Sequence, residues 1–228
     1  MNNEDIVRKA TDAGVHLVTF LYCDNGGVIR GKSAHISNLG SRMESGIGLT
    51  VAMQAMSDMD DLQPIEGMGP TGEIRLVPDP NTFVILPYAP KRAVMMADMY
   101  TLGRKPWAAC PREFLKQQVS HADGMGLTIQ AAFEPEWSLA RQDGDEFSPI
   151  DESLCFSGVG MMEPMDVIDD IVEALTAQGL QVEQYHPELG HGQQELTVHH
   201  ADALRAADNH IVYRETVRNV ARQHGLYA

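Results

Sequence analysis

The sequence predicts an α+β protein that is built from two modules. Between residues 1 and 105, short segments rich in β-forming residues recur, with proline-bearing turns between them and few helix patterns. Between residues 106 and 228, longer helix patterns alternate with strand patterns. The segment Arg104–Pro111, which carries two prolines and a tryptophan, separates them. We therefore expect one domain at 1–105 and a second at 106–228.

The composition narrows the classes of function. The chain has 228 residues, of which 43% are hydrophobic and 21% charged, so it is long enough to bury a core. A net charge of −15 argues against nucleic acid or an anionic membrane as partner, because both require a basic surface. The three cysteines are far apart, and neither a signal peptide nor an apolar run long enough to span a bilayer is visible. We therefore expect a cytoplasmic protein with reduced cysteines.

The first module is expected to begin with one helix, followed along the chain by several strands. Residues 4–13 show a helix pattern that ends at Gly14. The β-forming run His16–Asp24 is followed by the turn residues Asn25–Gly27 and then by Val28–Lys32, which together predict a hairpin. Three further strands are expected at 73–77, 82–86 and 93–99.

The second module is expected to alternate helices and strands. Pro111 suits the first position of a helix that runs to His121. A helix from Pro164 to Gly179 has one apolar side, and the longest helix pattern covers residues 201–224. Strands are expected at 127–139, 181–185 and 195–199, and the polar residues 141–151 are expected to form an excursion or turn.

Four glutamates are the strongest candidates for a functional site. Glu134 and Glu136 lie two positions apart on a predicted strand, so both side chains point to the same face. Glu188 and Glu195 flank a turn whose glycines, at positions 190 and 192, allow a sharp reversal that sets the two carboxylates opposite each other. Each pair alone is more often a solvated acidic surface. Four convergent carboxylates repel one another unless a cation lies between them, and Mg²⁺ and Mn²⁺ prefer such oxygen ligands. Together they predict a divalent-metal site that handles a phosphorylated substrate.

Other polar residues leave alternatives open. Glu183 lies five positions before Glu188, and it is expected either to face another ligand or to be a solvated strand residue. Four histidines gather in the same region: His186, His191, His199 and His200. They raise the weaker alternative of a histidine-bound zinc or iron in a hydrolase or oxygenase, but their spacing matches no H-E-x-x-H helix and no 2-His-1-carboxylate pattern. His200 alone is a candidate for lining the site.

Three runs of the sequence resemble the glutamine synthetase family, the ATP-dependent ligases that join ammonia or an amine to the γ-carboxylate of glutamate. Phe133–Trp137 resembles the family's E-P-E-F strand, and Glu188–Glu195 resembles its glutamate, glycine-glutamine and glutamate turn. The run from Asp202 to Ala228 resembles the helix that follows. Asp24–Arg30 and Val77–Pro80 are similar to parts of the family's β-grasp-like domain. The resemblance covers nearly the whole chain.

The resemblance implies a fold and a set of site residues. The fold would be a small β-grasp-like N-terminal domain, followed by the first, incomplete part of a glutamine-synthetase-type catalytic domain. Transferred by position, Glu136, Glu188 and Glu195 would hold one Mg²⁺ or Mn²⁺ ion, and Glu134 would be a ligand of a second ion. ATP would be the co-substrate, and two residues fall at nucleotide-contacting positions: Glu183 and His200.

The resemblance also implies a reaction and partners. The γ-carboxylate of glutamate would be phosphorylated by ATP, and ammonia or a small amine would then displace the phosphate. Family members form rings, so a homo-oligomeric ring is implied for the full-length parent. Gly46–Gln54 lacks the aspartate loop that binds ammonium, which favours an amine such as methylamine and points to the γ-glutamylmethylamide synthetase-like branch.

The chain ends before several later motifs of the family. Those motifs carry the remaining ligands of the second metal ion, the glutamate-binding arginines and the basic residues that hold the nucleotide. We therefore expect this polypeptide alone to be inactive, and we assign no catalytic residue within it. The alternative is a non-catalytic relative that binds metal, nucleotide or a full-length partner.

Overall fold

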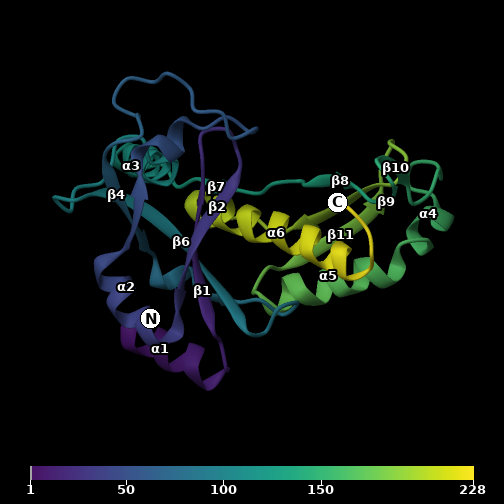
Figure 1. The fold of residues 1–228 in the computed structure, drawn as a ribbon. Coiled ribbons are helices and arrows are strands. Elements are labelled where there is room, and N and C mark those ends of the chain that lie inside the picture. Colours follow the sequence, from purple (N-terminus) through teal and green to yellow (C-terminus); the bar gives the residue numbers. More distant parts are fainter. Residues whose placement is uncertain (1) are drawn as a thin grey trace. The chain divides into compact units, whose positions relative to one another are not determined.

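The computed structural model describes residues 2–228, and its contacts divide the chain into two compact units. The first unit ends at Thr128 and the second begins at Ile129. Each unit combines helices with β-sheets, so the expected mixture of helix and strand is confirmed (Figure 1). None of the helices in the described part of the chain is long and apolar enough to cross a membrane.

A six-stranded sheet forms the centre of the first unit. Its strands are β1 (Leu17–Cys23), β2 (Ile29–His35), β3 (Ile47–Thr50), β4 (Glu73–Pro78), β5 (Val84–Ile85) and β6 (Arg92–Thr101). They follow the order β2-β1-β6-β4-β3, and β5 pairs with β6. Strands β1 and β6 run parallel, whereas the other neighbours are antiparallel.

The predicted hairpin is confirmed as the β1–β2 pair. Its turn is held by the buried carboxylate of Asp24, which accepts hydrogen bonds from the backbone N–H groups of Gly26 and Val28. The same carboxylate accepts a hydrogen bond from Nε of Arg30, and Arg30 also pairs with Asp60. The turn is therefore fixed by a carboxylate whose hydrogen bonds are satisfied from several sides.

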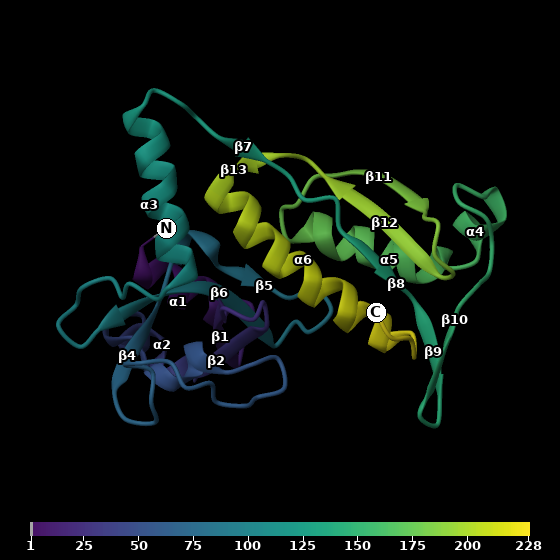
Figure 2. The same cartoon turned by 90° about the horizontal axis from the view of Figure 1, so that it is seen from above.

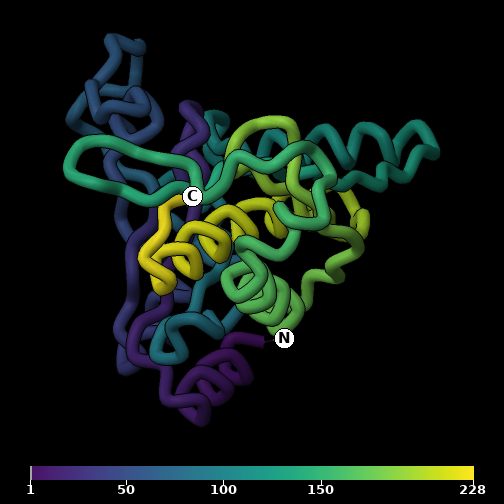
Figure 3. The backbone as a smooth tube through the Cα atoms, turned by 90° about the vertical axis from the view of Figure 1, so that its right-hand side faces the viewer, coloured from purple at the N-terminus to yellow at the C-terminus, as the bar shows by residue number. Residues whose placement is uncertain are grey.

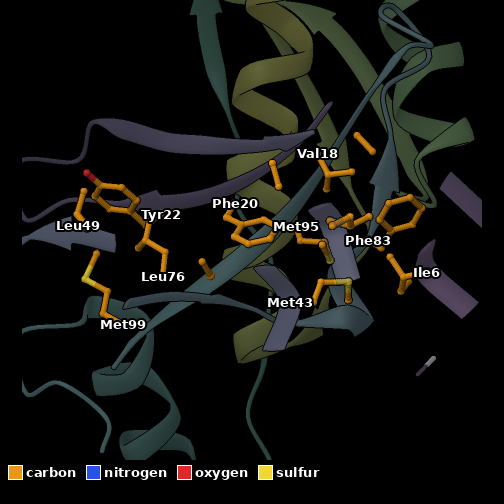
Figure 4. Packing of buried hydrophobic residues seen from close by; sticks show 14 of the residues in the cluster. Ile6, Val18, Phe20, Tyr22, Met43, Leu49, Leu76, Phe83, Met95 and Met99 are labelled. Carbon is orange, nitrogen blue, oxygen red and sulfur yellow. The ribbon is translucent and has the colours of Figure 1, made fainter. Parts of the chain in front are cut away.

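The core of the first unit lies between this sheet and the helices α1 (Asn3–Asp12) and α2 (Leu39–Ser45). Strand β6 is buried over residues 93–99 without a break, as expected for a central strand that is covered on both faces. Figure 4 shows apolar side chains from these elements packed together: Ile6, Val18, Phe20, Met43, Leu76, Phe83, Met95 and Met99. The methionines thus serve as ordinary core residues.

Two segments of the first unit differ from the expectation. Residues 39–50 contain α2 and β3, which the sequence pattern does not predict. The strand expected at 82–86 shortens to β5, because a 3₁₀ turn at Pro80–Thr82 comes first. The hydroxyl of Thr82 donates to the carbonyl oxygen of Asp79 and accepts from the N–H of Met96, so a side chain replaces a ladder hydrogen bond there.

Helix α3 (Pro111–Gly124) starts at the predicted proline and belongs to the first unit. Arg112 binds Asp79 and Asp98, each at 2.8 Å, and Lys116 also binds Asp98. Burial alone would raise the pKa of Asp79, but hydrogen bonds from Arg112 and from the backbone N–H of Asn81, together with the charges of Arg112 and Lys116, outweigh it and hold that pKa below its ordinary value. These ion pairs fasten α3 to the sheet.

A three-stranded antiparallel sheet forms the centre of the second unit. Its strands are β11 (Val182–Pro187), β12 (Gln193–Val198) and β8 (Glu136–Ser138), in that order. The helices α5 (Met165–Ala177) and α6 (Ala203–Gln223) lie beside this sheet, as Figure 2 shows. The two predicted helices and the strand pair around the glycine turn are therefore confirmed.

The helices cover one face of this sheet. Leu196 of β12 is fully buried, and the hydroxyl of Tyr213 on α6 donates to its carbonyl oxygen at 2.8 Å. The ring of Tyr213 also meets the ring of Trp137 on β8 edge-on. Because side chains alternate along a strand, the neighbours of Leu196 in β12 point to the other face.

The prediction of a single long strand at 127–139 is wrong. The structure has two short strands there, β7 (Gln130–Ala131), which pairs with β13 (Ala201–Asp202), and β8, which pairs with β12. Residues 132–135 between them are irregular. Pro135 has no N–H to donate to a ladder, so the strand is interrupted at this point.

The polar residues 141–151, which are expected to form an excursion or turn, form a hairpin with a turn at its tip. It comprises β9 (Ala140–Asp143) and β10 (Glu146–Pro149), with Gly144 in a left-handed conformation at its tip. Tyr227 near the C-terminus exchanges two backbone hydrogen bonds with Ala140, each 2.9 Å long, and Figure 3 shows the C-terminus beside this hairpin.

Replacing Asp98 with asparagine tests the role of the ion pairs on α3. Asp98 is 6% exposed, so its loss leaves Arg112 and Lys116 without their shared partner. We expect the free energy of unfolding to fall by about 2–3 kcal/mol, measured by urea denaturation. Asp5→Asn is the control, because its pair with Arg8 is exposed and contributes about 1 kcal/mol or less. Equal effects of the two changes would show that the network does not hold α3.

Candidate metal site on the three-stranded sheet

Strand register places three ligand-type side chains in one row. His186 of β11 lies opposite Glu195 of β12, and Glu195 lies opposite Glu136 of β8. Residues directly opposite each other in an antiparallel ladder project to the same face. This is the face that the helices leave open, since Leu196 points to the covered side. The row therefore brings together residues from three strands that are up to 59 positions apart.

Glu188 completes the group from the turn after β11. It lies two positions beyond His186, and its Oε1 is 2.9 Å from Nε2 of His186, while Oε2 of Glu195 is 3.3 Å from the same nitrogen. One ligand atom from each of these three residues lies within 4.8 Å of the others. Neighbouring ligands of an octahedral ion are about 3 Å apart when each bond is about 2.1 Å long. The spacing therefore suits a divalent ion.

The turn between β11 and β12 depends on Gly192. Gly192 has a φ of +65°, and a Cβ atom there would lie 2.6 Å from the carbonyl oxygen of Leu139. The N–H of Leu139 donates to the carbonyl oxygen of Gly192, so the two backbones are in close contact. Gly190 has no positive φ, but a Cβ atom there would lie 2.8 Å from the side-chain oxygen of Gln193. The sharp reversal expected from the two glycines thus rests on Gly192, both for its conformation and for its close backbone contact, whereas the nearest neighbour of Gly190 is a flexible side chain.

The first glutamate pair lies at the edge of the group. Glu136 is exposed at the end of the row and accepts a hydrogen bond from the side-chain amide of Gln193. Glu134 is exposed in the irregular segment before β8, so the strand alternation expected for this pair does not apply. Both carboxylates nevertheless act on Glu195, as its pKa shows.

The pKa of Glu195 is raised above its ordinary value. Burial is the largest cause, His186 opposes it, and the charges of Glu134, Glu188 and Glu136 raise it further. The charges of the other three predicted glutamates, Glu134, Glu136 and Glu188, therefore all act on the carboxyl group of Glu195. Their assignment as ligands of one ion and a second ion stays a prediction.

Sequence analysis names His186 only within the cluster of four histidines and does not place it beside the glutamates. The strand predicted at 181–185 ends before it, whereas β11 continues to Pro187 and sets His186 opposite Glu195. The other three histidines of the predicted cluster do not join it: His191 is exposed in the turn, and His199 and His200 lie beyond the far end of β12. Among residues 2–228, the group of His186 with Glu188 and Glu195 is the one that could hold a metal ion through three such side chains.

Glu183 and His200, the two residues expected to contact a nucleotide, both contact His199. Glu183 lies at an irregularity in the β11–β12 register, and its carboxylate contacts Nδ1 of His199 at 2.6 Å. The ring of His199 is 4.1 Å from the ring of His200, between centroids. Glu183 and His200 are both exposed, and their nucleotide role stays a prediction.

A short segment after β10, which we call the strap (Leu154–Ser157), borders the group. The N–H of Phe156 donates to the carbonyl oxygen of Pro187, and the ring of Phe156 meets the ring of His186 edge-on at 4.7 Å. The sulfur of Cys155 is 3.9 Å from Oε2 of Glu188. Desolvation and the charge of Glu188 raise the pKa of this thiol, which favours its protonated form.

Gly192→Ala tests the turn. The change forces an L-residue into a left-handed conformation and into the carbonyl oxygen of Leu139, so we expect a loss of about 2–4 kcal/mol in the free energy of unfolding. Gly144→Ala is the matched control, because Gly144 has a φ of +61° but open space around it, and about 1 kcal/mol is expected there. Urea denaturation of both variants measures the difference. A loss at Gly192 no larger than at Gly144 would contradict the close backbone approach.

Glu195→Gln tests the electrostatics of the group. The folded-state pKa of Glu195 is raised, so ionisation of this carboxyl at neutral pH works against folding. In the metal-free wild-type protein this group's contribution is greatest in acid and falls as pH rises from the ordinary glutamate pKa through the raised one. We expect the variant to lack this part of the pH dependence and to melt at a higher temperature at pH 7, while losing about tenfold or more in Mn²⁺ affinity. A lower melting temperature without metal would contradict the argument.

Comparison with known families assigns both parts of the chain. Residues 1–107 match the glutamine synthetase N-terminal domain, and residues 108–228 match the glutamine synthetase catalytic domain. A gamma-glutamylpolyamine synthetase of Streptomyces coelicolor is 34% identical over 96% of this chain and 48% of its own length. A glutamine synthetase of Thermus thermophilus is 36% identical over 75% of this chain and 41% of its own length.

Solved structures give the same result. A structure titled as a GmaS/ADP complex matches with a TM-score of 0.87 and 27% identity, over 98% of this chain and 50% of that chain. A structure titled as a novel glutamine synthase homolog matches with a TM-score of 0.84 and 32% identity, over 93% of this chain and 50% of that chain. The chain spans about half the length of the relatives it matches. Both family matches together cover it from end to end, and it belongs to the glutamine synthetase family.

Proposed function

We propose that the chain is the first half of an ATP-dependent ligase that joins ammonia or a small amine to the γ-carboxylate of glutamate. The observation that carries the proposal is the row His186–Glu195–Glu136, with Glu188 beside it, in a chain of this family. Such a group of carboxylates on an open sheet face is suited to an ion that binds phosphoryl oxygens.

The donor set fits Mg²⁺ or Mn²⁺. We propose that Glu136, Glu188 and Glu195 hold one ion and that Glu134 is a ligand of a second. The strand register that sets Glu136 opposite Glu195, and the approach of Glu188 and Glu195 to the same nitrogen of His186, support the first ion. The effect of Glu134 on the pKa of Glu195 supports its nearness to the same place. When bound, such ions neutralise the phosphoryl oxygens and align the attack on phosphorus.

The reaction balances with ATP as the only activating reagent. An oxygen of the glutamate γ-carboxylate attacks the γ-phosphorus of ATP, and ADP leaves with the electron pair of the broken P–O bond. The amine nitrogen then attacks the acyl carbon, phosphate departs with the C–O electron pair, and the amine loses a proton. In this chain the glutamates would hold the ions that bind and orient the phosphoryl group, and no residue is assigned as the proton acceptor.

Three further parts of the proposal come from the family. Glu183 and His200 are proposed to contact the nucleotide, at the end of β11 and β12 away from the turn. Residues 1–105 are proposed to be the family's β-grasp-like domain, with 106–228 as the first part of the catalytic domain. The parent protein is proposed to form a homo-oligomeric ring.

The amine is proposed to carry a substituent. Residues 46–54 lack the aspartate loop expected for ammonium binding, and they form β3 followed by a 3₁₀ turn at Val51–Ala55. Relatives are named for several substituted amines: a gamma-glutamylpolyamine synthetase, a gamma-glutamylanilide synthase of Acinetobacter at 24% identity and a glutamate–isopropylamine ligase of Pseudomonas at 28% identity. These names are consistent with a ligase for a substituted amine, although other relatives, such as that of Thermus thermophilus at 36% identity, are named glutamine synthetases. The missing aspartate loop is the feature that favours the substituted amine.

A second candidate function is non-catalytic binding. The chain spans about half of its relatives' length, so by itself it is proposed to bind a metal ion or nucleotide without turnover. Phosphate release by this chain alone from ATP, glutamate and an amine would support the ligase and contradict the proposed inactivity of the isolated half.

Metal binding is the direct test of the proposed site. We expect the chain to bind Mn²⁺, and we expect Glu136→Gln combined with Glu195→Gln to weaken this binding by about tenfold or more, because both changes remove ligand oxygens from one row. His191→Ala is the control, since His191 is exposed in the turn and outside the group. Titration followed by the electron paramagnetic resonance of free Mn²⁺ measures the affinities. If binding survives both glutamate changes, or falls equally with His191→Ala, the site assignment is wrong.

A further inference from the structure

Phe156 combines two unfavourable features at the border of the metal group. Its φ is +57°, a left-handed conformation that is a genuine outlier for a bulky side chain. The residue is also 61% exposed, although it is aromatic. The other non-glycine residues with positive φ in the described chain are Asp60 and Arg104, neither of which is apolar. Strain of this kind persists where surrounding contacts enforce it, and it clusters at functional sites.

Two contacts of Phe156 lead to the end of β11. The N–H of Phe156 donates to the carbonyl oxygen of Pro187 at 3.0 Å, which joins the strap to the strand between His186 and Glu188. The ring of Phe156 lies 4.7 Å from the imidazole of His186, with an interplanar angle of 81°. Ser157, the next residue, caps α4 (Gly158–Met162) by accepting from the N–H of Gly160. The strained residue thus links a helix start to the metal group.

We infer that Phe156 is a positioning residue: its ring and its left-handed backbone hold the imidazole of His186 in the metal group, so that the site binds Mn²⁺ in preference to Mg²⁺. This inference rests on the proposed metal site and adds a nitrogen ligand and a metal preference to it. The family-based assignment of the glutamates includes neither.

The chemistry of the ligands connects the contact to the preference. Carboxylate oxygens suit both ions, whereas Mg²⁺ demands near-ideal octahedral coordination by oxygen ligands and water, which an imidazole nitrogen in the group does not provide. Nε2 of His186 already lies 2.9 and 3.3 Å from the oxygens of Glu188 and Glu195, which is the spacing of adjacent ligands. Rotation of a histidine ring about its terminal torsion is otherwise broad. An aromatic edge packed on the ring at 81° restricts that rotation.

Phe156→Asn separates the ring from the backbone. Asparagine tolerates the left-handed conformation and keeps the N–H that bonds Pro187, so only the aromatic contact is lost. Phe156→Tyr keeps the ring and is the conservative variant. Leu154→Asn is the matched control in the same strap, because the side chain of Leu154 is 81% exposed. His186→Gln removes the imidazole itself.

The measurement is the ratio of Mg²⁺ to Mn²⁺ dissociation constants, from Mn²⁺ titration and Mg²⁺ competition on the full chain. We expect Phe156→Asn and His186→Gln each to weaken Mn²⁺ binding by about tenfold and to change Mg²⁺ binding by less than about twofold. The double variant should be no weaker than His186→Gln, since both act through one ligand. Phe156→Tyr and Leu154→Asn should keep the wild-type ratio.

Each other outcome has a defined meaning. An unchanged ratio in Phe156→Asn, or an equal loss for both ions, would overturn the inference and indicate a purely structural role for Phe156. If Phe156→Asn does not fold, as judged by circular dichroism, Phe156→Leu decides by the same ratio. A wild-type chain that binds neither ion would refute the proposed metal site itself, which is a different failure.

Discussion

The pairing of β12 with a strand on each side is the constraint on which the second unit depends. One face of β12 carries the buried side chain of Leu196. The carbonyl oxygen of Leu196 accepts a hydrogen bond from the hydroxyl of Tyr213 on α6. The opposite face carries Glu195, set between His186 and Glu136 by the same register. A shift of one residue in that register would exchange the two faces, placing a carboxylate under the helices and a leucine among the glutamates. Packing of the core therefore specifies the arrangement of the acidic row.

The acidic row is held against its own repulsion. The side chain of Glu195 is only 12% exposed. Burial is the largest cause of its raised pKa, and the charges of three other glutamates raise that pKa further. Two contacts offset this repulsion: the imidazole of His186 lies beside Glu195, and the side-chain amide of Gln193 donates to Glu136. The turn that sets this geometry requires a glycine at position 192. Stability and the proposed ion binding thus make opposite demands on the same few atoms, as is common where charge is gathered for function.

Sequence patterns predicted the elements that have strong local signals. The β1–β2 hairpin, the start of α3 at Pro111 and the helices near 164–179 and 201–224 follow from turn residues, proline and apolar periodicity. The prediction of one strand at 127–139 failed because Pro135 interrupts the ladder. The two short strands found there pair with strands about 60–70 positions away, and such distant pairing cannot be read from periodicity. Helix α2 and β3 were missed because each is short and their shared segment contains several glycines. The glutamates of the site were found from spacing, whereas the inclusion of His186 needed the register and the contact with the strap.

The anchoring of α3 has a consequence for dividing the protein into parts. The family match to the N-terminal domain ends at residue 107, but Arg112 and Lys116, which neutralise Asp98 and Asp79, lie beyond that position. A polypeptide that stopped at residue 107 would keep both aspartates and lose both cations, with Asp98 buried on the central strand β6. The family domain and the compact unit of this chain therefore end at different residues, 107 and 128, and a fragment that keeps the partners of Asp98 must include α3.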